Sequence, residues 1–198
     1  MAASLRRATV HDLCQMEDCS QRCIPERDAF LVQRFTVSVL CWPQLQWVAQ
    51  GHDGRIVGYV TVDMDQREGI AYVRSIAVLP PHRRSGLATK LVNLAHSDMI
   101  RVYDAECAKV NVRQSNDVAL KFFSNNRLGY TEHELMNLNH EEDDGEPFCV
   151  LRKQLRERQD VEDQPRPGAG DGGGNPGDEE VGPANHRPDD LGLEWLFI

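Results

Sequence analysis

The sequence predicts an α+β fold in which a mixed, mostly antiparallel sheet is flanked by about four helices, and three observations support this. Apolar runs typical of strands form hairpins in the first half of the chain, most clearly around the turn at residues 52–55. Apolar residues at three- and four-residue spacing after residue 86 indicate an amphipathic helix. The elements run β-α-α-β-β-β-α-β-α-β-β, which combines hairpins with a helical connection and so gives strands of mixed direction.

The first strand is predicted over residues 5–8, and the next helix is expected to start at a Thr9 cap, with Asp12 at its third position. A second helix is predicted over residues 27–40, before Pro43. The residues at helical offsets in this segment are Phe30, Leu31, Arg34, Phe35 and Val39.

Three strands follow these helices. Residues 46–50 and 56–63 are predicted to pair as a hairpin, because an Asp-Gly turn separates them. Residues 70–79 form a long apolar run and are expected to be the central strand. The later elements are a helix over 85–101, a strand over 107–113, a helix over 117–125, a strand ending at about 138 and a strand over 148–151.

The helix predicted at residues 117–125 has a well-defined start. Asn116 precedes it, and asparagine is among the preferred N-cap residues. Its apolar side chains are expected to pack on the sheet, and they are Val118, Leu120, Phe122 and Phe123.

Composition divides the 198 residues into a domain over 1–157 and a tail over 158–198. The apolar content of 40% is sufficient for a core. Residues 160–198 carry a net charge of −8 out of the total of −9, with eight of the fifteen glycines and five of the ten prolines. A segment of this composition buries too little apolar surface to offset its ordering entropy, so the tail is expected to be disordered.

Six cysteines are present, but the charged first twenty residues do not resemble a secretion signal. Disulfides are therefore not expected, and the cysteines are predicted to be mostly small core residues. Their spacing lacks a Cys-x-x-Cys pair, so no metal site is expected. No apolar run approaches the ~18 residues of a membrane span. A soluble, cytoplasmic protein with no membrane or nucleic-acid partner is expected.

The segment Arg83-Arg84-Ser85-Gly86-Leu87-Ala88 follows the apolar strand and opens a helix. Backbone N–H groups at such a helix start, with the positive end of the helix dipole behind them, can bind a phosphate. Small residues at Gly86 and Ala88 allow close approach, and Arg83 and Arg84 add positive charge. The alternative is an ordinary basic helix start, since the spacing matches neither a Walker loop nor Gly-x-Gly-x-x-Gly.

Six blocks, in order and in register from about residue 4 to about residue 156, extend this motif. With it they resemble the GNAT family of N-acetyltransferases, in particular the catalytic subunits of N-terminal acetyltransferase A (NatA) complexes. The blocks are Cys23-Ile24-Pro25-Glu26, Trp42-Pro43-Gln44-Leu45, Ile56-Val57-Gly58-Tyr59-Val60, Ser75-Ile76-Ala77-Val78 through His82-Arg83-Arg84-Ser85-Gly86-Leu87-Ala88, Val112-Arg113-Gln114-Ser115-Asn116, and Ala119-Leu120.

The resemblance implies acetyl-coenzyme A as co-substrate. Backbone groups of Ile76, Ala77 and Val78 would hold the pantetheine arm and polarise the acetyl carbonyl, and they also suit a plain core strand. The residues implied at the diphosphate are Arg83, Arg84, Ser85, Gly86, Leu87 and Ala88. Asn116 would lie beside the pantetheine, or would only cap its helix, and Phe123 would lie on the coenzyme side.

Residues around the reacting amine are implied in the same way. Glu26 corresponds to the family's active-site glutamate, although an exposed first-turn residue is the alternative. Arg113 would position the reactants, or would be a surface charge. Peptide-substrate contacts are implied for Ile24, Pro25, Tyr72 and His140, the last of which is otherwise a surface histidine. One carboxylate acting through water is sufficient, because an α-amino group titrates near ~7.7–8.0 and is partly neutral at pH 7.

Two departures from the family pattern are visible. Phe123 stands where relatives have a tyrosine, which removes a hydroxyl near the leaving thiolate. The stretch from Leu138 to Glu146 lacks the adjacent tyrosines of the relatives and has two extra residues.

The resemblance implies a larger helical-repeat auxiliary subunit, docked on the first two helices, and action at the ribosome on nascent chains. The preferred hypothesis is an N-terminal acetyltransferase. The alternatives are a lysine or small-amine acetyltransferase and a coenzyme-binding regulatory subunit.

Overall fold

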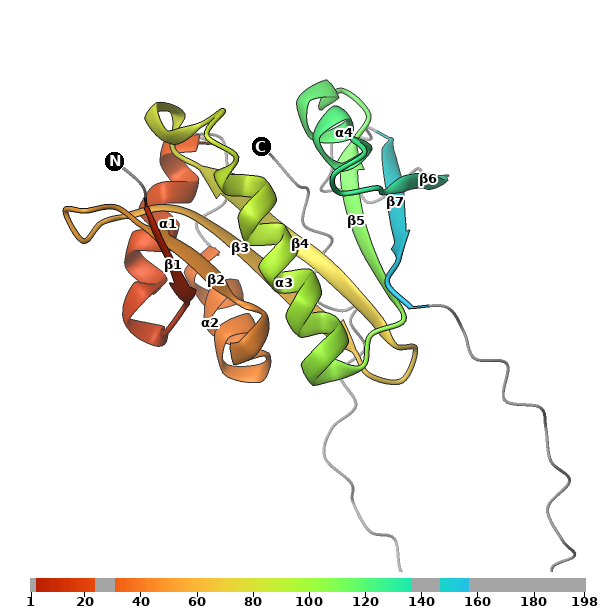
Figure 1. The fold of residues 1–198 in the computed structure, drawn as a ribbon, viewed down its shortest axis with the longest axis horizontal. Helices are drawn as coiled ribbons and strands as arrows, with labels where there is room; N and C mark the ends of the chain where they lie inside the picture. Colours follow the sequence, from red (N-terminus) through yellow and green to blue (C-terminus); the bar gives the residue numbers. More distant parts are fainter. Residues whose placement is uncertain (1–2, 24–30, 137–146, 157–198) are drawn as a thin grey trace, which may run out of the picture. The chain divides into compact units, whose positions relative to one another are not determined.

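The computed structural model describes residues 3–23, 31–136 and 147–156, and these form seven strands and four α-helices (Figure 1). The strands are β1 (Ser4–Arg7), β2 (Trp47–Gln50), β3 (Ile56–Asp65), β4 (Ile70–Val78), β5 (Cys107–Arg113), β6 (Thr131–Met136) and β7 (Phe148–Gln154). The helices are α1 (Leu13–Cys23), α2 (Leu31–Cys41), α3 (Leu87–Tyr103) and α4 (Asp117–Phe123), with short 3-10 turns η1 (Val10–Asp12), η2 (Pro43–Leu45) and η3 (Pro80–His82).

The seven strands make one sheet in the order β1-β2-β3-β4-β5-β7-β6. Neighbouring strands are antiparallel except for β4 and β5, which are parallel and are joined through α3. The predicted α+β class, the mixed sheet and the predicted element order are confirmed.

Helices cover both faces of the β2–β4 part of the sheet. Helix α3 packs on β2, β3 and β4, and on the opposite face α1 packs on β3 and β4 and α2 on β3 (Figure 1). Because both faces are covered, β3 and β4 are apolar and buried along most of their length. The helices contribute fully buried side chains to this core, among them Met16, Phe35, Leu91 and Met99.

The first helix starts in two steps. Thr9 is the N-cap of η1, which leads directly into α1, and Asp12 accepts hydrogen bonds from the Thr9 backbone N–H at 2.8 Å and hydroxyl at 2.9 Å. Asp12 also binds the Arg6 guanidinium through both of its oxygens, at 2.7 Å each. These bonds, with that from Arg6 the strongest, hold the pKa of Asp12 below its usual value although the side chain is buried. The predicted cap is therefore present, with a 3-10 turn between it and the helix.

Several element boundaries differ from the prediction by one to three residues, and one predicted core side chain is exposed. Helix α3 begins at Leu87 and not at residue 85, because Arg84 (φ 59°) and Gly86 (φ 77°) adopt left-handed conformations that a helix cannot include. Strand β7 continues to Gln154, where it still pairs with β5. Val118 on α4 is 61% exposed and does not pack on the sheet.

Half of the six cysteines lie in the core. Cys19, Cys107 and Cys149 are buried, and Cys23 is half-buried. Cys14 and Cys41 are exposed, so the prediction of mostly core cysteines holds for only half of them. All six are free thiols.

Several predicted residues lie outside the described part of the chain, namely Ile24, Pro25, Glu26, His140 and the tail over 158–198. None of the helices that the structure describes has both the length and the apolarity needed to cross a membrane.

Candidate active site

The site is built on a separation between β4 and β5. Residues 70–72 pair with residues 107–109, and the strands, both fully described, make no further pairs with each other. Strand β4 continues to Val78 and β5 to Arg113, and Figure 1 shows the two strands diverging toward these ends. The carboxyl ends of the two parallel strands thus share no backbone pairing, and the space between these ends is called the crevice.

The crevice edge of β4 carries main-chain groups that no strand uses. The Leu79 N–H donates to the Val57 carbonyl at 2.9 Å, which fixes the antiparallel pattern of β3 and β4. Since bonded and non-bonded pairs alternate, Ala77 is bonded to β3, while the N–H and C=O groups of Ile76 and Val78 point to the crevice. Of the three residues expected at the pantetheine, Ile76 and Val78 therefore offer main-chain groups there, and Ala77 does not.

The loop after β4 brings the basic motif to the mouth of the crevice. Arg83 Nε donates to the Val78 carbonyl at 2.8 Å, which folds the side chain back along the strand end. The Ser85 hydroxyl donates to the His82 carbonyl at 2.7 Å and closes the loop internally. Arg83, Arg84 and Ser85 are all exposed, so the loop presents its positive charge to solvent.

The amino end of α3 is open to a ligand. The first intrahelical bond runs from the Lys90 N–H to the Gly86 carbonyl at 3.1 Å, so the amides before it, from Leu87 to Thr89, have no partner within the helix. Gly86 is the N-cap and offers no capping side chain. The Leu87 side chain is buried and Ala88 is half-buried, so these two residues would bind through their backbone. A 17-residue helix places the positive end of its dipole here.

Gly86 has the conformation that such a loop requires. Its φ of 77° is left-handed, which glycine adopts without strain, and an added Cβ would have no atom within 4 Å. No atom of the described residues therefore crowds the Cβ position of Gly86.

The opposite wall contains Arg113 at the end of β5 and Asn116 three residues later. Arg113 is half-buried and pairs in register with Phe148 of β7. The Asn116 side chain accepts a hydrogen bond from the Ala119 N–H at 3.0 Å, so its predicted capping role is confirmed. Tyr72, at the last β4–β5 pair, lies at the base of the crevice, and the Arg74 guanidinium stacks over its ring at 5.0 Å.

Phe123 does not fit the expectation that it lies on the coenzyme side. Its ring is fully buried, in edge-to-face contact with Phe122 and Tyr130 at 5.0 and 5.1 Å between centroids. The Tyr130 hydroxyl in turn meets His96 Nε2 of α3 at 2.7 Å. Phe123 belongs to the packing beneath the crevice, so it would affect a ligand only through that packing.

Sequence reasoning gave Cys23 no functional role, although it directly precedes the Ile24-Pro25-Glu26 block. It is the last residue of α1, and its Sγ lies 3.5 Å from the Val78 carbonyl oxygen, at the crevice edge of β4. Two sequence features could have indicated a role for Cys23: it adjoins that block, and it lies one helical turn after Cys19.

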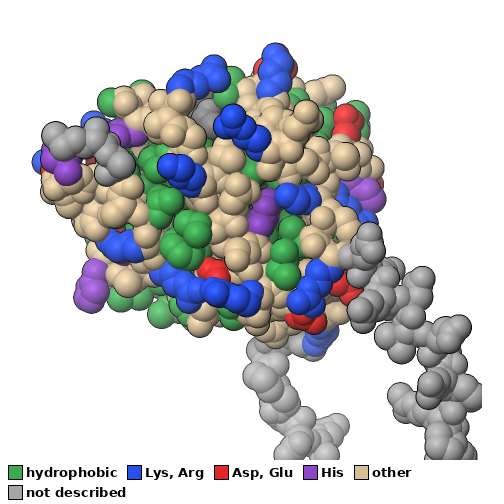
Figure 2. Space-filling view, viewed as in Figure 1, with side chains coloured by type: hydrophobic (Ala, Val, Ile, Leu, Met, Phe, Trp, Pro, Cys, Tyr) green, Lys and Arg blue, Asp and Glu red, His purple; other side chains and the backbone are tan. Residues whose placement is uncertain are grey.

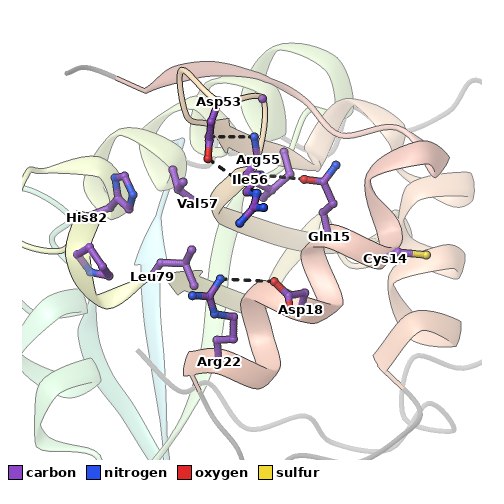
Figure 3. A pocket seen from close by; sticks show the side chains of 12 residues that line it. Cys14, Gln15, Asp18, Arg22, Asp53, Arg55, Ile56, Val57, Leu79 and His82 are labelled. Atoms are coloured by element: carbon purple, nitrogen blue, oxygen red, sulfur yellow. Dashed lines mark hydrogen bonds and ion pairs between the residues drawn. The ribbon is translucent and has the colours of Figure 1, made fainter.

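A second hollow lies beside the crevice, between α1, the β2–β3 turn and η3, with a volume of about 650 Å³ (Figure 3). Its charged groups are already paired, Arg22 with Asp18 at 3.7 Å and Arg55 with Asp53 at 3.9 Å. Of the expected diphosphate residues, none lines it.

The geometry suits a ligand that has an anionic group for the helix end and an amide-bearing chain for the free strand edge. The diphosphate and pantetheine of coenzyme A have both features. On the face that carries α3, basic side chains are more widespread than acidic ones, which favours an anion (Figure 2). Within the described residues, no group of three His, Cys, Asp or Glu side chains is placed to hold a metal ion.

Comparisons with known proteins agree with this geometry. Residues 12–130 match the acetyltransferase (GNAT) family. The catalytic subunit NAA10 of the N-terminal acetyltransferase A complex of Arabidopsis thaliana is 39% identical over 157 residues, which cover 78% of this chain and 79% of that protein.

Two solved structures share the fold. Ard1 from Thermoplasma volcanium superposes with a TM-score of 0.68 at 19% identity, covering 79% of this chain and 100% of that one. Arabidopsis thaliana Naa50, in complex with a bisubstrate analogue CoA-Ac-MVNAL, gives a TM-score of 0.65 at 18% identity, covering 78% and 99%. The chain belongs to the GNAT acetyltransferase family.

Proposed function

We propose that this protein transfers the acetyl group of acetyl-coenzyme A to the α-amino group of polypeptide chains, as the catalytic subunit of a NatA-like complex. The observation that carries the proposal is the free edge of β4 beside the uncapped, basic amino end of α3. The NAA10 relative, named as a catalytic subunit of such a complex, supports the choice of reaction.

The coenzyme would be held mainly by main-chain groups. Its diphosphate would accept from the amides at the start of α3, with Arg83 and Arg84 adding charge. Its pantetheine amides would pair with Ile76 and Val78 as a further strand would. An N–H group of this same edge would then stabilise the oxyanion that forms when the amine attacks the thioester.

Deprotonation of an α-amine needs only a weak base. With a pKa near ~7.7–8.0, its deprotonation at pH 7 costs about 1 kcal/mol, against roughly 4–5 kcal/mol for a lysine near ~10.4. A single carboxylate acting through water can take this proton, and we assign that role to Glu26, which lies outside the described residues. Arg113 and Tyr72, on the wall and at the base of the crevice, would position the peptide end.

A partner subunit would dock on the first two helices. On α2, Leu40 is 65% and Val37 is 40% exposed, and on η1, which contacts α2, Val10 is 45% exposed. Exposed apolar side chains on neighbouring elements are typical of protein interfaces. The expected partner is a large helical-repeat subunit that brings the enzyme to the ribosome in the cytoplasm.

The test is acetyl transfer from acetyl-coenzyme A to three peptides, one beginning with Ser, one with Asp, and one with a blocked amino terminus and a free lysine. We expect turnover on a free α-amine and none on the blocked peptide, and the reverse result would make the protein a lysine acetyltransferase. Coenzyme binding without turnover on any peptide, even with an auxiliary subunit present, would indicate a regulatory subunit.

Glu26→Gln separates binding from chemistry in the same assay. We expect turnover to fall by about a hundredfold, as for the loss of a general base, with coenzyme affinity unchanged. A fully active variant would remove Glu26 from the mechanism.

A further inference from the structure

Cys23 packs against the edge of the core, and its thiol also reaches a main-chain group of β4. Its sulfur lies 3.5 Å from the Val78 carbonyl oxygen, which also accepts from Arg83 Nε at 2.8 Å. Because the main-chain groups of Val78 face away from β3, this thiol lies at the crevice edge of β4, where the pantetheine is expected. It is half-buried and not sealed in the core.

The Val78 carbonyl accepts a hydrogen bond from the protonated Cys23 thiol, whereas Cys19 and two arginines favour its thiolate. Cys19, one turn earlier on α1 and fully buried, forms a hydrogen bond to it, and the positive charges of Arg83 and Arg22 lie close by. The Cys19 hydrogen bond, followed by Arg83 and Arg22, lowers the pKa of Cys23 to about 6 against the effect of desolvation. The same hydrogen bond and burial raise the pKa of Cys19, so Cys23 is the more easily ionised thiol of the pair.

We propose that Cys23 is a modification site, at which a disulfide of coenzyme A forms a mixed disulfide with the protein inside the coenzyme crevice. The inference rests on the proposed function, because that function places coenzyme A beside Cys23. A Cys19–Cys23–arginine cluster alone would specify no ligand, whereas the free strand edge and the anion-binding helix end specify this one.

The reaction is a balanced thiol–disulfide exchange. The Cys23 thiolate attacks one sulfur of coenzyme A disulfide, a Cys23–coenzyme A disulfide bond forms, and the original S–S bond breaks. The second coenzyme A leaves as a thiolate and takes a proton from water. The disulfide reagent is the oxidant, and the modified enzyme has its coenzyme crevice filled until a reductant releases it.

The reactivity of Cys23 should be most distinctive in mild acid. A thiol with a pKa near 6 is half ionised at pH 6, whereas an ordinary thiol near ~8.5 is almost entirely protonated. Lower basicity also makes a thiolate less nucleophilic, which leaves a net advantage of about tenfold at pH 6 and only about twofold at pH 7. Binding of the coenzyme moiety adds selectivity over other disulfides.

The test treats the reduced, full-length protein with coenzyme A disulfide at pH 6, followed by intact-mass measurement and peptide mapping. We expect one coenzyme A per chain, on Cys23, removed by dithiothreitol and prevented by prior acetyl-coenzyme A. Oxidised glutathione, which has no diphosphate, should react at least about tenfold more slowly, since a tenfold difference needs only ~1.4 kcal/mol of binding.

Two variants complete the design. Cys23→Ser should abolish the adduct, and Cys14→Ser, which removes an exposed thiol of the same helix, should leave the adduct unchanged. Mapping of the wild-type chain needs no variant, so poor folding of Cys23→Ser would not decide the outcome.

Binding of acetyl-coenzyme A in calorimetry would leave the proposed function standing. In that case, an adduct that forms equally on Cys14 or Cys41, or that does not form on Cys23, would reject the modification site alone. If acetyl-coenzyme A neither binds nor protects Cys23, the proposed function fails as well. Equal rates with the glutathione and coenzyme A disulfides would likewise reject a coenzyme-specific site.

Discussion

The two ends of strand β4 are both rich in apolar residues but have different partners. At its start, residues 70–72 pair with β3 on one edge and β5 on the other. From residue 73 to residue 78 it pairs with β3 alone. One end is therefore interior sheet, whereas along the second edge of the other end none of the described strands pairs with β4.

Backbone hydrogen bonds close the paired end. The Gly69 carbonyl accepts from the Glu106 N–H at 2.8 Å, and the Glu106 carbonyl accepts from the Leu155 N–H at 2.8 Å, so the turns before β4, before β5 and after β7 are connected. At the other end, within the described part of the chain, the Val78 carbonyl accepts from the side chains of Arg83 and Cys23. The comparison shows how a sheet can hold together at one end while its other end keeps main-chain groups for a ligand.

A substitution in the loop at the open end of β4 should weaken coenzyme binding more than any other change. Gly86→Val places a β-branched side chain at a φ of 77°, where it distorts the loop and covers the amides of α3. We expect coenzyme affinity to fall at least about 30-fold, or ~2 kcal/mol. Stability should fall by only about 1–2 kcal/mol, because a Cβ there has no atom within 4 Å.

Gly129→Val is the matched control for this experiment. Gly129 has a φ of 69° and equally open surroundings, but it lies between α4 and β6. The stability loss should therefore be similar, with coenzyme affinity unchanged. Calorimetric titration and chemical denaturation measure the two quantities, and equal affinities for the two variants would reject the phosphate loop.

Acid should destabilise the folded protein through one buried histidine. His96 of α3 is 6% exposed, and burial, with a smaller effect of Lys153, lowers its pKa to about 3. Below pH ~6.5 this histidine binds a proton in the unfolded chain but stays neutral in the folded protein. Acid therefore favours unfolding. Between pH 6.5 and 3 this group should reduce the free energy of unfolding by up to about 1.4 kcal/mol per pH unit.

His96→Gln removes this titration while keeping a polar group near Tyr130. Chemical denaturation from pH 7 to pH 4.5 should give a shallower pH dependence for the variant than for the wild type. His52→Gln, at an exposed turn, should leave the wild-type curve unchanged. Parallel curves for wild type and His96→Gln would show that His96 is not held neutral.

The sequence was sufficient for features that depend on local periodicity or local hydrogen bonds. The element order follows from apolar spacing, and the Asn116 cap follows from a side chain that reaches an amide three residues away. The β2–β3 hairpin follows from its turn residues.

Features that depend on contacts between distant segments could not be predicted. The β4–β5 pairing stops after three residues because of how the whole sheet is arranged, and neither strand shows this in its own pattern. The left-handed Arg84 delays α3 by two residues, although arginine has no preference for that conformation. Cys23 reaches Val78, 55 residues away, only in the folded chain.

The smallest effects are expected at Asn116, which caps α4 and is also proposed to contact the pantetheine. Asn116→Ala should cost about 1 kcal/mol of stability, because the Ala119 N–H loses its acceptor. Asn116→Asp keeps a capping oxygen and should leave stability within about 0.5 kcal/mol, but it replaces the amide donor with a negative charge. If the side chain contacts the coenzyme, the Asp variant should bind it several-fold more weakly than the wild type, in calorimetry at fixed salt. Wild-type affinity in the Asp variant would restrict Asn116 to capping and would leave Ile76 and Val78 to hold the pantetheine alone.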